Sequence, residues 1–544
     1  MSMFTDSLDA SLDLTISGAA FNIPGGNIKG FQAKIHSYGF TCRVSFIVSS
    51  EDETDNLLAS FTTLDLIEAK LQLTPHLPPD GSQLQPLTLT GLVTDKEILL
   101  ERTVEHVPLE GNPVLYRHYQ VVFADPAQVL WRQHHPFDLL VDKSMKDVID
   151  AHKGDKITIT YDWSVLDTTH PVNTVPLGIE ARNGSFYDFI MWYVFSRDGV
   201  WSYSNQDNTY SLLETKSSEG QAVNIDALDI ETFSVRFPET IRYNANVLNA
   251  YVDNPQTAAI TQDQAATTIR RDYMARYPVA QDFQDRQTLE TQRLRTRSHE
   301  VHLTFRRFPT IDFYPGCFIK LEGGLWSENI FPNGNTYRVR EIVLDGEPEN
   351  PELTADHNLS FSSFHMNLEA QLELQAEQYV SLPSFISPSF PIFVEGKVVS
   401  EQGDEKAETF QIYQDSTTQR DQYKVTIPLW SNQQVVAAFE PVFFSGHFFF
   451  PAYKNEHVLV RLMLNSAAID RFLDWRADAR LTMDSQGNRI LMGQDAGSRT
   501  IVTHSYEDSK PVLSVERNSD KDLQVIKLSE GSLLLKTMEG GESS

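Results

Sequence analysis

Apolar and polar residues alternate with a period of two along many segments of the chain. The clearest examples are Lys156–Trp163, Tyr423–Leu429 and His457–Leu464. Successive side chains of a strand point to opposite faces, so this period is typical of strands with one buried face. The chain also contains 32 Phe and 19 Tyr, and aromatic residues favour strands. The pattern therefore predicts a mainly β protein.

Helical patterns are few. Residues Ser144–His152 begin with a Ser that can cap a helix, place three apolar residues on one face and are followed by Gly154. Residues Ser185–Gly199 also begin with a capping Ser and end at a Gly, which is typical of a helix stop. A more polar helix is predicted within Thr261–Arg276, and a polar helix-like run covers Leu368–Glu377.

Three prolines lie within Ser381–Phe393, which predicts a linker between domains. The segment that follows, residues 390–475, contains about five short strands, enough to close a small barrel. The linker therefore separates a large N-terminal part from a smaller barrel.

From Arg480 onward, short strands alternate with turns. The strands are Arg480–Met483, Arg489–Met492, Thr500–Thr503, Pro511–Val515, Leu523–Ile526 and Ser532–Lys536. Short strands at roughly 10-residue spacing cannot bury a core alone and must stack on copies of themselves. An oligomeric β-prism is the favoured interpretation, because a single sheet with one dry face needs a partner. An ordinary small β-domain stays open as the alternative.

The chain of 544 residues is strongly acidic, with 74 Asp and Glu against 45 Lys and Arg and a net charge of −29. This charge repels phosphate backbones and anionic lipid headgroups, so no nucleic-acid partner is expected. Cys42 and Cys317 form neither a disulfide framework nor a zinc cluster, which fits a reducing compartment. The first residues lack the layout of a signal peptide, so we expect cytoplasmic assembly.

No motif for catalysis or cofactor binding is present. The sequence lacks a G-x-S-x-G elbow, a phosphate loop and a G-x-G-x-x-G fingerprint. His299 and His302 are three residues apart, a spacing that would separate them by about 300° on a helix, and their surroundings alternate like a strand. We therefore expect no catalytic residues, no cofactor and no metal, and a structural or binding role instead of an enzyme.

One segment departs from the overall acidity. Between Arg270 and Arg307 there are nine Arg and five acidic residues. This basic segment could pair with acidic surfaces of neighbouring subunits. A solvated surface is the alternative interpretation.

Several pieces, in this order, resemble one known family. They are Thr90–Glu97, Tyr116–Asp125, Val129–Trp131, Phe137–Ile149, Ser185–Tyr203, Tyr210–Leu213, Phe313–Leu321, Thr336–Val343, Val394–Ser400, Tyr423–Ile427 and Phe450–Leu462. Together they resemble the VgrG and phage baseplate hub-spike family of contractile injection systems, which includes type VI secretion systems, extracellular injection particles and myophage tails. The resemblance spans nearly the whole chain.

The resemblance implies a domain order. It implies a first hub barrel in residues 1–125, an inserted α+β domain in 126–215, and a second hub barrel with a connecting segment in 216–380. An OB-fold barrel in 390–475 and a short trimeric β-helix spike in 476–544 would follow.

The resemblance also implies a function. The chain would be a homotrimeric hub and spike that joins a hexameric inner tube to a membrane-puncturing tip, contacts baseplate proteins and helps deliver effectors. An alternative is a multi-domain β-rich surface protein that binds carbohydrate or protein. The oligomeric state discriminates between the two, because only the spike requires a trimer.

The last predicted strand suggests a binding site. Its apolar residues, with Met538 just beyond, are Leu533, Leu534 and Leu535, and unpaired strand edges at an exposed end invite pairing. Three copies of Leu533 and Leu535, or of Leu534, depending on register, would form an apolar platform. The resemblance implies that a PAAR-like tip protein covers it. The alternative is that these side chains only fill the last layer of the prism.

Overall fold

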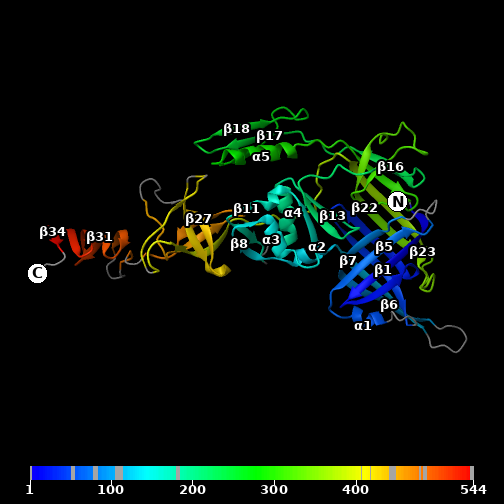
Figure 1. Cartoon of the computed structure of the whole chain (residues 1–544), viewed down its shortest axis with the longest axis horizontal. Coiled ribbons are helices and arrows are strands. Elements are labelled where there is room, and N and C mark those ends of the chain that lie inside the picture. The colour runs from blue at the N-terminus through cyan, green and yellow to red at the C-terminus, as the bar shows by residue number, and fades with distance from the viewer. Residues whose placement is uncertain are drawn as a thin grey trace. The chain divides into compact units, whose positions relative to one another are not determined.

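The computed structural model describes residues 3–50, 56–77, 84–104, 114–178, 184–405, 407–416, 418, 420–439, 449–476, 479–481 and 487–539. It divides the chain into two compact units. Unit 1 comprises residues 1–135, 149–167 and 177–388, and unit 2 comprises residues 136–148, 168–176 and 389–544. Both units are built mainly from strands (Figure 1), as the alternating pattern predicts. Among the described helices, none combines the length and hydrophobicity that crossing a bilayer requires.

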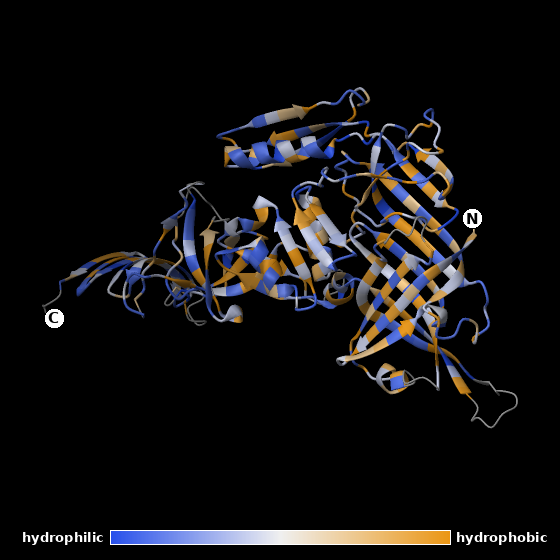
Figure 2. Cartoon of the chain, turned by 45° about the vertical axis from the view of Figure 1, so that its right-hand side comes forward, coloured by the Kyte–Doolittle hydropathy of each residue, from blue (hydrophilic) through white to orange (hydrophobic). Residues whose placement is uncertain are grey.

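The main feature of unit 1 is a closed ring of eight strands. The ring order is β1, β5, β6, β7, β4, β3, β22 and β23, and it closes because β22 pairs with β23. The bounds are β1 (Phe4–Ile16), β3 (Ile28–His36), β4 (Gly39–Ser49), β5 (Ile67–Pro75), β6 (Leu87–Val104), β7 (Val114–Ala124), β22 (Thr336–Pro348) and β23 (Phe361–Leu374). Strand β2 (Ala19–Pro24) pairs with β1, and η1 (Gly25–Asn27) and α1 (Leu57–Phe61) lie in connections. Hydrophobic and hydrophilic positions alternate along these strands (Figure 2).

The barrel that the sequence assigns to residues 1–125 thus also contains a hairpin from more than two hundred residues later in the chain. Gly346 of β22 lies opposite Phe31 of β3, and a Cβ at Gly346 would lie 2.3 Å from the Phe31 ring. Glycine is therefore required at this position. The Phe31 ring in turn contacts Phe364 of β23, with 5.1 Å between the ring centroids, so aromatic packing helps to close the ring.

A second set of strands shares the same hairpin. The β22–β23 hairpin continues past the ring, where β22 pairs with β21 and β23 pairs with β20. This second sheet has the order β15, β21, β22, β23, β20 and β16. The new bounds are β15 (Val223–Asn224), β16 (Ile230–Arg236), β20 (Glu300–Phe305) and β21 (Phe318–Lys320). The polar helix predicted at Leu368–Glu377 is wrong, because residues 361–374 form β23, which pairs with β1, β20 and β22.

An aromatic cluster occupies the inserted region of unit 1. Its elements are α2 (Pro126–Leu130), η4 (Trp131–Gln133), β10 (Thr158–Asp162), η5 (Ser164–Asp167), α4 (Phe186–Ser196), β13 (Val200–Ser204) and β14 (Thr209–Leu213). Trp131, Trp201 and Tyr210 are buried and in ring contact. The helix predicted from Ser185 is confirmed, and Ser185 and Asp188 form a capping box at its start. The helix predicted from Ser144 is confirmed as α3 (Met145–His152).

A small subdomain interrupts the second sheet between β16 and β20. It consists of β17 (Asn244–Asn249), β18 (Gln256–Ile260), β19 (Arg270–Ala275) and α5 (Ala280–Arg293), with Val247 and Phe283 in its core. The helix predicted within Thr261–Arg276 is wrong, because β19 pairs in parallel with β17 there. The helix of this region starts at Ala280 instead, and its buried residues are Phe283 and Glu290.

Unit 2 contains a five-stranded closed barrel. The ring order is β24, β28, β29, β27 and β26, and β24 pairs with β26 to close it. The bounds are β24 (Ile392–Val399), β25 (Tyr413–Gln414), β26 (Asp421–Ile427), η6 (Pro428–Trp430), β27 (Gln433–Phe439), β28 (His457–Leu462) and β29 (Ala467–Phe472). Strands β27 and β29 are parallel. The prediction of a small barrel after the linker is confirmed.

Two short pieces of the inserted region belong to unit 2. Strands β8 (Phe137–Leu140) and β12 (Asn173–Pro176) pair with each other, as do β9 (Lys143–Ser144) and β11 (Thr169–His170). Leu139 and Val172 are buried in the core of the five-stranded barrel. The Thr174 amide donates to the carbonyl of Leu464 at 2.9 Å, so these pieces are part of the barrel's packing.

Candidate functional site: the C-terminal meander

The last part of unit 2 is a five-stranded antiparallel meander. Its strands are β30 (Asn488–Asp495), β31 (Ser498–Glu507), β32 (Lys510–Ser519), β33 (Asp522–Ser529) and β34 (Ser532–Met538), paired in chain order. Five of the six short strands predicted after Arg480 are confirmed here. The sixth, Arg480–Met483, lies partly outside the described residues.

One face of the meander carries a continuous apolar row. Because residues directly opposite in paired strands share a face, the register places Ile490, Val502, Val515, Ile526 and Leu535 in one line across all five strands. A neighbouring line on the same face contains Leu513, Leu528 and Leu533. We call this surface, defined by these eight residues, the apolar face.

The apolar face is not covered by its own chain. Ile526 is 46% exposed, Leu533 is 61% exposed and Leu535 is 68% exposed. All residues of β34 are exposed. A monomeric soluble protein rarely leaves a contiguous apolar surface of this kind in water. The geometry therefore suits contact with another polypeptide.

The opposite face is mixed. It carries Arg499, Glu516, Lys527 and Lys536 together with Leu523 and Val525. Leu491, Ile501 and Val512 of β30 to β32 also lie on this face and are buried within the chain. Charged side chains interrupt the exposed rows of the face, so its exposed part can remain in water.

The four residues predicted to hold a tip protein divide between the two faces. Leu533 and Leu535 lie on the apolar face, opposite Leu528 and Ile526. Leu534 and Met538 lie on the mixed face, opposite Lys527 and Leu523. The period of two in β34 separates them, so the four side chains do not form one patch within a single chain.

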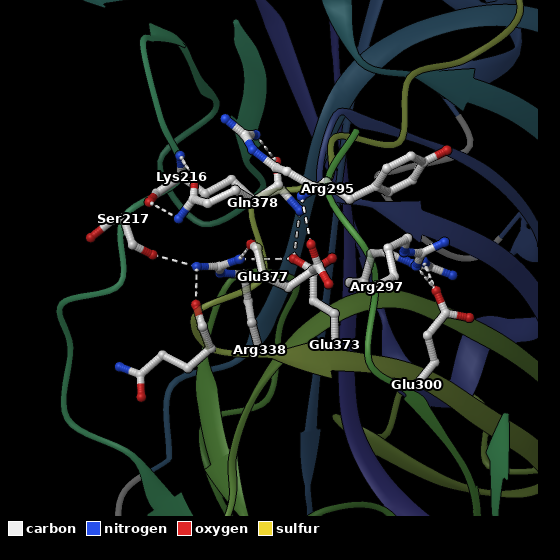
Figure 3. Close-up of polar contacts among 12 residues, drawn as sticks. Lys216, Ser217, Arg295, Arg297, Glu300, Arg338, Glu373, Glu377 and Gln378 are labelled. Atoms are coloured by element: carbon white, nitrogen blue, oxygen red, sulfur yellow. Dashed lines mark hydrogen bonds and ion pairs between the residues drawn. The ribbon is translucent and has the colours of Figure 1, made fainter. Parts of the chain in front are cut away.

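A network of buried charged side chains lies in unit 1, where the chain leaves the second sheet after β23 (Figure 3). Glu373 of β23 is 2% exposed and accepts hydrogen bonds from Lys216 Nζ at 2.7 Å and Arg338 Nη1 at 2.8 Å. Arg338 also donates to the carbonyls of Gln375, at 2.8 Å, and of Ser217. These bonds tie the segment Lys216–Ser217 to the β22–β23 hairpin, which comes more than a hundred residues later in the chain.

Burial affects the lysine of this network. Burial lowers the pKa of the Lys216 ammonium, and Glu373 opposes that effect. The second oxygen of Glu373, Oε2, is buried without a hydrogen-bond partner among the described residues. Sequence reasoning missed this network, although a Glu and an Arg in otherwise apolar alternating strands were a signal for it.

A related cluster surrounds Glu300 at the start of β20. Its carboxylate, 3% exposed, pairs with both Arg297 and Arg340. Burial opposes the ionisation of Glu300, but Arg340 and Arg297 outweigh burial and hold its pKa below the ordinary value. His299 beside it contacts the Tyr337 hydroxyl through Nε2 at 2.9 Å, and residues 300–305 form the strand that the alternation predicts.

The basic segment 270–307 pairs largely with its own chain. Seven of its nine Arg contact a carboxylate of the same chain, namely Arg270, Arg286, Arg293, Arg295, Arg297, Arg306 and Arg307. Most cations of this segment are therefore already paired within the chain. Contact of the segment with acidic surfaces of neighbouring subunits stays a prediction. Within the described residues, no cluster of three or more His, Cys, Asp or Glu side chains could hold a metal.

The fold is similar to solved structures despite low sequence identity. A chain of the half-lidded Francisella PdpA–VgrG complex matches with a TM-score of 0.74 and 10% identity, over 98% of this chain and 88% of that chain. Chains of the lidless PdpA–VgrG complex and of the lidded Francisella complex match with a TM-score of 0.73 and 10% identity, over 98% of this chain and 99% and 80% of those chains.

The chain has the fold found in the PdpA–VgrG complex. The resemblance to VgrG proteins that the sequence indicates is thereby confirmed at the level of the fold. No protein-family model and no curated protein matches the sequence.

Proposed function

We propose that this chain is the hub-and-spike subunit of a contractile injection apparatus and works as a homotrimer. The observation that carries the proposal is the uncovered apolar row from Ile490 to Leu535. Three meanders arranged about an axis would bury three copies of this row against one another and leave the mixed faces in water. Full burial of one Val, Leu or Ile side chain stabilises by about 1.5–3 kcal/mol, so burying the exposed members of three rows favours the trimer.

The rest of the fold supports the same function. The closed eight-stranded ring and the six-stranded second sheet share the β22–β23 hairpin. Two related sheets in each chain would present six faces in a trimer, which matches the symmetry of a hexameric inner tube. The five-stranded barrel of unit 2 has the strand number of an OB-fold. The meander after it is the proposed short spike, a trimeric β-helix.

The proposed partners follow from this arrangement. Unit 1 would contact the tube and baseplate proteins, and the meander would carry a PAAR-like tip protein near Leu533, Leu534, Leu535 and Met538. The assembly would deliver effectors when the apparatus contracts. This role is structural, and the proposal assigns no catalytic step to the chain.

The oligomeric state tests the proposal. Light scattering on the full chain should give about 185 kDa, three times the chain mass of 61.7 kDa. Ile526→Asp should reduce the mass to that of a monomer at micromolar concentration, because it places a carboxylate in the proposed dry interface.

Val525→Asp is the matched control. Val525 is the neighbour of Ile526 in β33 but lies on the mixed face, opposite Lys536, so this variant should remain a trimer. A monomeric wild-type chain, or equal effects of the two variants, contradicts the proposed spike.

A further inference from the structure

Unit 1 contains a large hollow lined by arginines. Its volume is about 750 Å³, within the range of ligand-binding pockets. It lies between the small β17–β19 subdomain, the turn after α4, the second sheet and the segment Tyr379–Leu382. Six arginines line it, namely Arg236, Arg271, Arg293, Arg295, Arg297 and Arg340. We call it the arginine hollow.

The arginine hollow is positive in an acidic chain. Only three carboxylates line it, those of Asp198, Glu239 and Glu300, so its six arginines exceed them by three. The whole chain carries −29. A concave surface of one sign, with protein walls around it, concentrates counter-ions of the other sign. The hollow therefore favours an anionic ligand.

Several arginines are held in place by internal bonds. Arg293 donates to Glu290 at 3.1 Å and to the carbonyls of Phe195 at 2.9 Å and Ser196 at 3.2 Å. Arg295 pairs with Asp198 at 3.3 Å and donates to the Gln378 carbonyl. These bonds build a rigid wall, part of which is visible in Figure 3.

Other arginines of the hollow retain binding capacity. Arg297 and Arg340 share the single carboxylate of Glu300, and the Arg297 Nε is buried without a hydrogen-bond partner among the described residues. Among the residues that the structure describes, Arg271 donates to the Tyr243 hydroxyl at 3.1 Å, pairs with no carboxylate and stacks on that ring. Arg236 is exposed and makes no ion pair with a described residue. Arg236 and Arg271 thus lack a carboxylate partner.

Aromatic and aliphatic side chains complete the lining. The Arg297 guanidinium lies 4.2 Å from the centre of the Tyr379 ring, and Phe195, Val380 and Leu382 also face the hollow. The two arginines without a carboxylate partner come from different strands, β16 and β19. A compact phosphate needs neither the apolar lining nor this spread of cations. A polypeptide with acidic and apolar side chains uses both.

We propose that the arginine hollow binds an acidic segment of a partner polypeptide, in which Asp or Glu alternates with apolar residues. Its carboxylates would pair with Arg236 and Arg271, and its apolar side chains would pack on Tyr379, Val380 and Leu382. The proposal is independent of the spike, because every residue of the hollow belongs to unit 1.

Fluorescence anisotropy on the full chain tests the proposal with a labelled synthetic peptide of alternating Glu and Leu. We expect saturable binding that weakens as salt is added. The double variant Arg236→Gln and Arg271→Gln should weaken binding at least about tenfold, since it removes two charge-assisted hydrogen bonds to the peptide. Neither side chain pairs with a carboxylate among the described residues, so the double variant should fold.

Arg270→Gln is the matched control. Arg270 precedes Arg271 in β19 and points to the opposite face of the strand, where it pairs with Asp272. It removes one positive charge from the same strand as Arg271→Gln does, and should change binding by less than about twofold. The proposal is overturned if the Arg270→Gln control loses as much affinity for the peptide as the double variant does. It is also overturned if an alternating Gln–Leu peptide binds as tightly as the Glu–Leu peptide. Tight binding of inorganic pyrophosphate with no binding of the acidic peptide overturns it as well, because it would make the site a phosphate pocket.

Discussion

At the scale of single residues, buried charges in unit 1 are stabilised by precise pairing. Glu300 stays ionised only because two guanidinium groups face it, and Glu373 is held by Lys216 and Arg338. Burying a carboxylate without such partners costs several kcal/mol. The pairs also join segments that are distant in sequence, so each of them fixes a long-range register as well as a local charge.

Glu300→Gln should destabilise the hub by about 2 kcal/mol or more at pH 7, because Arg297 and Arg340 lose their shared counter-charge. The folded-state pKa of Glu300 is lowered, so its stabilisation is fully present above the ordinary carboxyl pKa of about 4.3. It is lost as the pH falls through the lower folded pKa. The difference between wild type and variant in urea midpoint should therefore shrink below about pH 4.

Glu369→Gln is the control for this measurement. Glu369 is exposed on β23, and its replacement should shift stability by less than about 0.5 kcal/mol at any pH. A Glu300 effect that does not change with pH would contradict the assigned pairing.

At the scale of elements, different strands of the meander serve the two proposed roles, trimer formation and binding of a tip protein. The apolar row needs every strand, but β34 contributes only its last member, Leu535. Strands β30 to β33 would still supply four of the five positions to a trimer. The outer edge of β34 has no neighbouring strand among the described residues, and an open edge is where a further protein can add.

A chain that ends after Gly531 lacks β34 and should remain a trimer by light scattering. It should lose a co-expressed PAAR-like protein in affinity purification, because the side chains of Leu533, Leu534, Leu535 and Met538 are absent. A chain that ends after Glu539 retains β34 and serves as the control. If the shorter chain still retains the tip protein, the leucines only fill the last layer and the tip binds elsewhere.

At the scale of the whole molecule, the chain passes between its two units more than once. The linker 381–393 is one passage, and its first half is held on α4, where the Ile386 amide donates to Asp188 at 3.2 Å. The pieces 136–148 and 168–176 are others, since they belong to unit 2 although their neighbours in sequence belong to unit 1. Cutting the linker therefore leaves other covalent passages intact.

Limited proteolysis within the linker should give two bands on a denaturing gel but a single peak on size exclusion. The fragment that contains Leu139 and Val172 keeps them in the barrel core of unit 2, which holds the two fragments together. Leu139→Asp with Val172→Asp should let the nicked fragments separate. Lys143→Gln, at an exposed position of β9, is the control and should leave a single peak. Separation of the nicked wild type would contradict this packing.

Local patterns in the sequence determined the strands, the two capped helices, the linker and the resemblance to hub-spike proteins, because side-chain period, caps and prolines act within a few residues. Only the tertiary structure decided that β22 and β23 close the first barrel, since strand partners are chosen by long-range register. It also decided that Leu368–Leu374 and Arg270–Ala275 are strands, where pairing overrode helix-like composition. Which of the two sets, Leu533 with Leu535 or Leu534 with Met538, lies on the apolar face depends on the pairing of β34 with β33. The assembly of the arginine hollow from six separate segments likewise depends on which faces the folded chain turns toward each other.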